Sequence, residues 1–326
     1  MPAVPAPGLA AIAGDWTVDP LVALGVTAAA VAYLAGVRAL RRRGDAWPVG
    51  RTIAWYGGLA LLVVATMSGL GTYDTQSFGA HMVQHMLLNM VIPLPLALGA
   101  PVTLALRTLP PAPRRRLLAL LHSRFSRVIT APVVVLPIFV GSTFALYFTG
   151  IYPYSLDHVW AHDLVHVHFL ASGSLFAWVV AGVDPLPRPG YGARMLLVVS
   201  ALPFHAFLGV ALLSQTSLLA AQHYEALGRP VAALLDEQHT GAGLLWASGE
   251  FIGVALLFTV LAQWMRSDQR LAVRTDRRLD REEEIADSAT RVRDRRRAIS
   301  ERDAAEDAAL AAYNARLASL DDAPRS

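Results

Sequence analysis

The sequence predicts an all-α polytopic membrane protein with seven transmembrane helices, an outward N-terminus and a cytoplasmic C-terminus. Of its 326 residues, 54% are hydrophobic and only 16% are charged, whereas charged residues make up about a quarter of an ordinary soluble domain. Seven stretches reach the roughly 20 mostly apolar residues that a membrane span needs. We therefore divide the chain into an outer N-terminal segment at 1–19, a seven-helix membrane domain at 20–265 and a charged cytoplasmic tail at 266–326.

The seven spans follow one another in chain order. The first begins at Asp19 and Pro20, whose residue types are preferred at a helix N-cap and at the first helical position. The third contains Pro93, Pro95 and Pro101, which must kink or break it because proline cannot donate a backbone hydrogen bond. We predict spans at about Leu21–Leu40, Thr52–Leu70, His81–Leu106, Ile129–Gly150, His158–Ala181, Arg194–Gln215 and Thr240–Met265.

The arginines set the predicted orientation, because basic connections stay on the cytoplasmic side of a membrane. Arginines gather after the first span, between the third and fourth, and between the fifth and sixth. The connections 71–80 and 151–157 have no basic residue, and 216–239 has only Arg229. Residues 1–18 also lack a basic residue, so we expect no cleaved signal peptide.

Three segments outside the spans have a pattern of their own. Pro113–Arg127 mixes leucines with arginines and predicts an amphipathic helix on the inner leaflet. The outer connection Ser217–Glu237 is expected to cap the outer mouth of the bundle. The tail from Arg266 to Ser326 predicts a solvated helix or docking handle, and an unstructured polar tail is the alternative.

The histidines carry the main functional signal. All but His122 of the ten histidines lie in outer connections or in the outer halves of the predicted spans. The chain contains no cysteine, which excludes disulfides and thiolate metal sites. Residues four apart share one face of a helix, and such a pair of histidines can chelate one ion. Two such pairs occur, and the predicted metal ligands are His81, His85, His162, His166, His205 and His239.

A second set of side chains is predicted to support these ligands. His158 continues the fifth-span stripe at its rim, Asp163 can orient His166, and Glu250 is an intramembrane carboxylate on the face of His239. Imidazole with thioether suits copper, and imidazole with carboxylate suits Cu(II) or zinc. Simpler roles remain open: an interfacial histidine, core methionines and an ordinary ion pair. The supporting candidates are His158, Met82, Met86, Asp163 and Glu250.

At these residues the chain resembles the CtaG family of cytochrome c oxidase assembly factors. The resemblance runs from about Thr52 to Arg266. It implies a seven-helix protein of a bacterial plasma membrane that is needed for oxidase assembly and supplies copper to the binuclear centre. The motifs that carry it are H-M-V-Q-H-M-L-L-N-M (81–90), G-A-P (99–101), Y-P-Y-S-L-D-H-V-W-A-H-D-L-V-H-V-H-F (152–169), D-P-L-P-R-P (184–189), P-F-H-A-F-L-G (203–209) and D-E-Q-H-T-G-A-G-L-L-W (236–246).

Three functional hypotheses follow. The first is a copper-binding assembly factor that exchanges ligands and is not an enzyme; its partners are a cytochrome c oxidase subunit or another copper carrier and the lipid bilayer, with no nucleic acid. The second is a haem-binding membrane cytochrome, with His205 opposite His166 as axial ligands. The third is a metal or proton transporter with a path through Glu250 and His205. The sequence leaves open whether the two histidine pairs face each other.

Overall fold

The structure is a computed structural model that describes residues 7–185, 187 and 189–321, and no strand occurs in these ranges. Six helices are long and apolar enough to cross a membrane, and a bent helix pair brings the number to seven if it counts as one span. The predicted all-α membrane fold is therefore confirmed, while its orientation stays a prediction. The chain forms two compact units, Met1–Ala262 and Gln263–Ser326, which are described separately.

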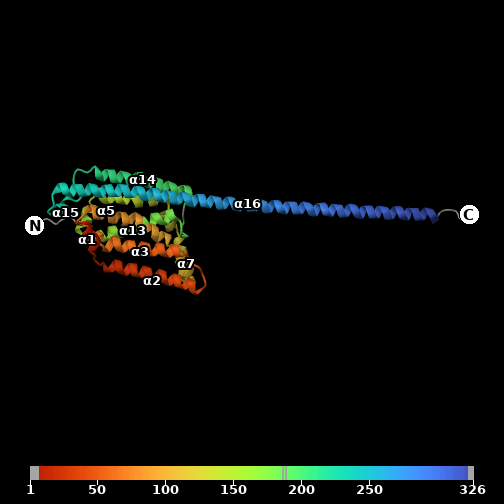
Figure 1. Ribbon diagram of the computed structural model, residues 1–326, viewed down its shortest axis with the longest axis horizontal. Coiled ribbons are helices and arrows are strands. Elements are labelled where there is room, and N and C mark those ends of the chain that lie inside the picture. Colours follow the sequence, from red (N-terminus) through yellow and green to blue (C-terminus); the bar gives the residue numbers. More distant parts are fainter. Residues whose placement is uncertain (1–6, 186, 188, 322–326) are drawn as a thin grey trace. The chain divides into compact units, whose positions relative to one another are not determined.

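The first unit contains the candidate spans, whose long helices run alongside one another (Figure 1). Two short π-helical turns, η1 and η2, interrupt its helices. The elements in chain order are α1 (Leu9–Gly14), α2 (Pro20–Arg42), α3 (Val49–Met67), α4 (Gly69–Tyr73), α5 (Phe78–Met86), η1 (Leu87–Val91), α6 (Pro93–Leu98), α7 (Pro101–Thr108), α8 (Pro111–Leu121), α9 (Arg124–Ile129), α10 (Pro132–Leu136), η2 (Pro137–Gly141), α11 (Ser142–Phe148), α12 (Ile151–Asp157), α13 (Val159–Ala181), α14 (Tyr191–Leu213), α15 (Ala221–Glu225) and the beginning of α16 (Val231–Asp321).

Local sequence explains where helices α2 and α5 begin. Asp19 caps α2 as predicted, because its Oδ1 accepts hydrogen bonds from the backbone N–H groups of Leu21 at 2.8 Å and Val22 at 3.1 Å. Ser77 caps α5 in the same manner, since its Oγ accepts from the N–H of Ala80 at 3.2 Å. Such caps satisfy backbone donors that have no partner within the helix.

The third predicted span is interrupted, as its prolines required. Pro93 lacks an N–H group and its ring crowds the carbonyl four residues earlier, and the backbone widens into the π-helical turn η1 directly before it. Ala100 then adopts a left-handed conformation with φ 51° immediately before Pro101, which starts α7. The segment Phe78–Thr108 still qualifies as one span.

The fourth predicted span ends earlier than expected. It runs through α10, η2 and α11 and turns by 73° into α12, which occupies residues predicted to be an outer connection. The turn brings Tyr147 of α11 within 5.3 Å of Tyr152 of α12, measured between ring centroids. Both phenol rings are buried, so the bend places two aromatic side chains inside the bundle.

Helix α13 is central to the packing, since it contacts α6, η1 and α14. Its Gly173 lies so close to η1 that a Cβ there would collide with the backbone oxygen of Asn89. At Gly249 of α16 a Cβ would similarly collide with the ring of His205. These glycines allow close helix approach, as small residues do in membrane proteins.

The two other segments for which the sequence predicted a helix, Pro113–Arg127 and the tail, are helical in the structure. The segment predicted as an amphipathic helix forms two helices, α8 and α9, separated at His122 and Ser123. In the second unit the tail is helical as far as Asp321. Its helix carries i,i+4 ion pairs, including Arg278–Glu282 and Arg297–Glu301, of the kind that supports an exposed helix.

We expect Gly173→Ala to destabilise the first unit by about 1–3 kcal/mol, the usual effect of overpacking a core. The added methyl group meets backbone, which cannot rotate away as a side chain can. Thermal unfolding in detergent measures the effect. Gly192→Ala is the control, since a Cβ at Gly192 has no atom within 4 Å. Equal melting temperatures for the two variants would contradict the close packing of α13 on η1.

Candidate metal site

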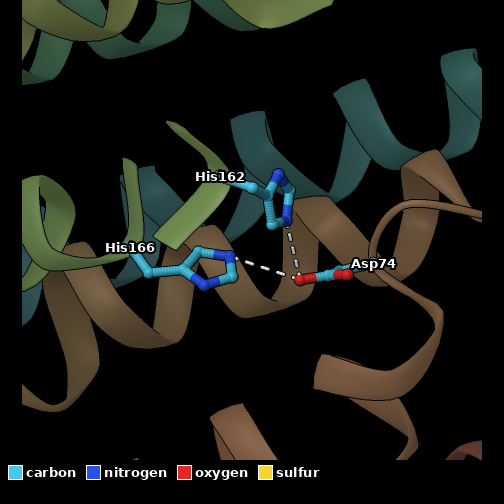
Figure 2. Close-up of side chains that lie close together, drawn as sticks. All are labelled: Asp74, His162 and His166. Carbon is cyan, nitrogen blue, oxygen red and sulfur yellow. Dashed lines mark hydrogen bonds and ion pairs between the residues drawn. The ribbon is translucent and has the colours of Figure 1, made fainter. Parts of the chain in front are cut away.

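The site is built around Asp74, which lies in the connection between α4 and α5. Its Oδ2 accepts a hydrogen bond from Nε2 of His162 at 2.9 Å and lies 3.3 Å from Nε2 of His166 (Figure 2). Within the described ranges, these are the His and carboxylate side chains that form a ligand group, with ligand atoms all within 4.8 Å of one another. Two nitrogens and one oxygen thus converge on one point.

Two elements bring these three side chains together. Helix α13 starts at Val159, so His162 and His166 lie one turn apart on one face of it. The carboxylate comes from the loop that ends at the Ser77 cap of α5. Asp74 is separated from His162 by 88 residues in sequence, so the group exists only once these helices have packed.

The connection after α14 holds this loop in place. Nε2 of His223 donates to the carbonyl of Thr75 at 2.9 Å, and Arg229 donates to the carbonyl of Gln76. Arg229 also pairs with Glu237 at 2.7 Å. The connection therefore contacts the loop of Asp74, while its predicted position at the outer mouth stays a prediction.

Asp74 is only 4% exposed, and its charge depends on the two histidines. Burial raises the pKa of the Asp74 carboxyl, but the hydrogen bond from His162 and the close contact with the ring of His166 outweigh burial and hold the pKa below its usual range. Asp74 is therefore ionised at neutral pH. An ionised carboxylate beside two imidazoles is a donor set typical of Cu(II) or zinc sites.

Unsatisfied nitrogen atoms support the fit to a metal. In native structures the great majority of buried polar atoms have a hydrogen-bond partner. Among the described residues seven buried side-chain N or O atoms lack one, and five of them belong to histidines. Gln84, which lines the cavity described next, contributes another through its Oε1. The five histidine atoms are His81 Nδ1, His85 Nε2, His162 Nδ1, His166 Nε2 and His205 Nε2.

The three candidate ligands line a cavity of about 470 Å³ that is partly open to solvent. Two further carboxylates also line it, the half-buried Asp19 and the exposed Asp163. Its described lining contains no arginine. The cavity therefore favours a cationic occupant.

The second histidine pair lies beside this site. His81 and His85 of α5 are each 1% exposed, and the ring of His81 lies 5.9 Å from that of His162, between centroids. The pairs are therefore neighbours, which the sequence could not show. They do not form one four-histidine group, because the hydroxyl of Tyr147 stands between His81 and His85, at 3.0 Å and 3.1 Å.

The other two predicted ligands lie elsewhere. His205 is buried in α14 against Gly249 of α16. Nε2 of His239 donates to the backbone carbonyl of Gln215 at 2.9 Å and so ties α16 to the end of α14. Neither belongs to the ligand group around Asp74, and metal binding by either stays a prediction.

The five supporting candidates also lie outside the ligand group around Asp74. His158 does not extend the helical stripe, because its backbone is extended, with φ −133°; its exposed ring stacks on Tyr154 at 4.0 Å. Asp163 is exposed on the cavity wall, and Glu250 is half-buried outside the group. Met82 and Met86 are buried in the main apolar core.

Sequence reasoning missed Asp74 and Tyr147. Neither residue is among the ligands or supporting side chains predicted from the sequence. The one distinguishing signal of Asp74 was an acidic residue in a connection without basic residues, shortly before His81. Nothing in the sequence around Tyr147 indicated a contact with two histidines, since both lie more than 60 residues away.

Fold and site together define a polytopic helical membrane protein with a buried histidine–aspartate group at one end of its bundle. The chain belongs to the family described as cytochrome c oxidase caa3 assembly factor, whose sequence model matches residues 31–267. The resemblance seen in the sequence is thereby confirmed.

Relatives in mycobacteria extend this comparison. Uncharacterized proteins of Mycobacterium bovis and Mycobacterium tuberculosis are each 40% identical over 283 residues, which is 84% of this chain and 43% of theirs. One from Mycobacterium leprae is 40% identical over 274 residues, 81% of this chain and 42% of its own. The chain thus spans less than half the length of these relatives. No solved structure matches.

We expect Asp74→Asn and His162→Ala to be strongly non-additive in the free energy of unfolding, with a coupling of about 0.5–3 kcal/mol, because the two residues share one buried hydrogen bond. Chemical or thermal unfolding of the two single variants and the double variant measures this coupling. Asp163→Asn combined with His162→Ala is the matched control, since Asp163 is exposed. Additive effects for the Asp74 pair would show that the contact contributes nothing to stability.

Proposed function

We propose that this protein is a membrane-bound assembly factor for cytochrome c oxidase that holds copper at Asp74, His162 and His166 and passes it to the oxidase. The observation that carries the proposal is this ligand group, found in a chain of the caa3 assembly-factor family. Each fact alone is weaker. One fold can support many different functions, and histidine–aspartate hydrogen bonds also occur in proteins where they only stabilise the fold.

The donor set suits a cargo ion that must be released again. Three protein ligands leave at least one coordination position open, and an open position is where an incoming ligand enters. The negative charge of Asp74 offsets part of the charge of the ion, so the ion does not enter a neutral pocket alone. Transfer then proceeds by ligand exchange, without making or breaking covalent bonds in a substrate, and we propose no enzymatic activity.

The cavity provides room for a partner. A water molecule takes up about 30 Å³ of liquid, so a cavity of about 470 Å³ is far larger than a bare ion requires. A ligand-bearing segment of an oxidase subunit, or of another copper carrier, fits this space beside the ion. The carboxylates of Asp19 and Asp163 on the cavity wall favour the approach of a cation. The protein would act within a bacterial cell membrane.

The two alternative functions find less support. A haem needs facing histidines and space for a porphyrin, yet the void beside His205 measures only about 10 Å³. A transport path needs polar groups throughout the bundle, but Ala97, Ala177 and Ala181 pack as an apolar cluster further along α6 and α13. Metal loading from the cavity end of the bundle agrees better with this apolar packing than transport through the bundle does.

We expect Asp74→Asn to lower the copper affinity of the purified protein by at least about 10-fold, because losing a carboxylate that only supports a metal-bound histidine already costs about 10–100-fold and Asp74 is a proposed ligand itself. His162→Ala combined with His166→Ala should abolish binding at this site. Isothermal titration or competition with a chelator measures both. The matched control is His122→Ala combined with His158→Ala, which also removes two histidines, both exposed.

The same variants test the role in the cell. A strain carrying His162→Ala and His166→Ala should assemble inactive oxidase, and the control strain should assemble active oxidase. Unchanged copper stoichiometry in the first variant would reject the site. Copper loss with fully active oxidase would reject the delivery role.

A further inference from the structure

One buried cluster has no role in the proposed outer site. Tyr147 of α11 lies between two histidines of α5, its hydroxyl oxygen 3.0 Å from His81 Nε2 and 3.1 Å from His85 Nδ1. All three side chains are at most 3% exposed. Three donor atoms from two separate elements therefore meet deep in the bundle.

The two nitrogens of each histidine ring in this cluster differ in their hydrogen bonding. A phenol has one proton, so Tyr147 can donate to only one of the two rings, and the other ring must donate to Tyr147. The far nitrogens, His81 Nδ1 and His85 Nε2, have no partner. The candidate ligand atoms are instead the near nitrogens, His81 Nε2 and His85 Nδ1, which both face the Tyr147 oxygen.

We propose that His81, His85 and Tyr147 form a second, buried metal position with two imidazole ligands and one phenolate ligand. The two histidines are four residues apart on a helix, which is the chelating spacing, and their near nitrogens already face one oxygen. The proposal rests on the proposed function only for the kind of ion, copper, and its donor atoms are different ones.

Phenolate supplies the charge that the cluster otherwise lacks. An ion buried without a counter-charge is costly, and within 3.1 Å of these two ring nitrogens the structure describes no carboxylate contact. When the ion binds, a bond forms between the metal and the Tyr147 oxygen, and the phenolic proton is released to solvent. No electron is transferred, so no oxidant or reductant is required.

The surroundings hold the ligands in place. The ring of His85 stacks on Phe169 of α13 at 4.0 Å with an interplanar angle of 6°. Tyr147 packs at 5.3 Å against Tyr152, whose hydroxyl hydrogen-bonds to that of Tyr224 at 2.7 Å. Preorganised ligands of this kind lose little freedom on binding.

The second position is next to the first. The His81 ring is 5.9 Å from that of His162, which is a ligand of the outer site. An ion that arrives in the cavity therefore has a deeper, solvent-shielded position within one side-chain length. The outer site exchanges ions with a partner, and the inner position retains one.

The test uses Cu(II) and the purified full chain. Wild-type protein should bind two ions per chain. Removing the outer site with Asp74→Asn, His162→Ala and His166→Ala should leave one ion, with a phenolate-to-Cu(II) charge-transfer band in the visible spectrum. Adding Tyr147→Phe to that variant should abolish the band and weaken binding at least about 10-fold. Tyr152→Phe is the matched control, because it removes one buried hydroxyl from the neighbouring ring and should keep the band.

Each outcome is decisive. One ion in wild-type protein, lost with the outer ligands, would reject the second position and leave the proposed function intact. A bound ion without the band, unaffected by Tyr147→Phe, would show that Tyr147 only bridges the histidines. No ion in wild-type protein would reject the proposed function together with this inference. If the triple variant does not fold, Tyr147→Phe alone decides the question, since it should reduce two ions to one.

Discussion

A carboxylate that is almost completely removed from water must be compensated, and at Asp74 the compensation comes from the hydrogen bond of His162 and from the ring of His166 beside it. This constraint governs the end of the bundle where α4, α5 and α13 meet. It requires the loop before α5 to reach the first turns of α13, and it explains why His223 and Arg229 fasten that loop from outside. It also places a fixed negative charge where an incoming cation would meet two imidazoles.

Sequence reasoning predicted what depends on local or periodic patterns. The cap at Asp19, the interruption of the third span at Pro93 and the helical pairing of His162 with His166 follow from such patterns, and the structure has all three. The contacts of Asp74 and Tyr147 join segments more than 60 residues apart, and no local pattern encodes them. His158 was misplaced because it lies at the N-cap of α13 with an extended backbone, just before the helix begins at Val159.

Two π-helical turns lie beside the histidines, and they link the fold to the site. Turn η1 follows directly on the helix of His81 and His85, and η2 precedes the helix of Tyr147. Such turns occur frequently at functional sites because they shift the register of the side chains that follow. Here the helices next to them contribute the His81–Tyr147–His85 contacts, and Gly173 lets α13 approach η1 closely enough to stack Phe169 on His85.

The sequence separation of the ligands has a thermodynamic consequence. Asp74 and the two histidines of α13 meet only in the packed bundle, so an ion that binds all three binds the folded chain in preference to the unfolded one. By mass action, a ligand present at 100 times its dissociation constant adds about 2.7 kcal/mol to the stability of the folded state. Under the proposed function, loading and folding would therefore be linked: the bound ion would cross-link the α4–α5 loop to α13, and its release would return that end of the bundle to a less stable form.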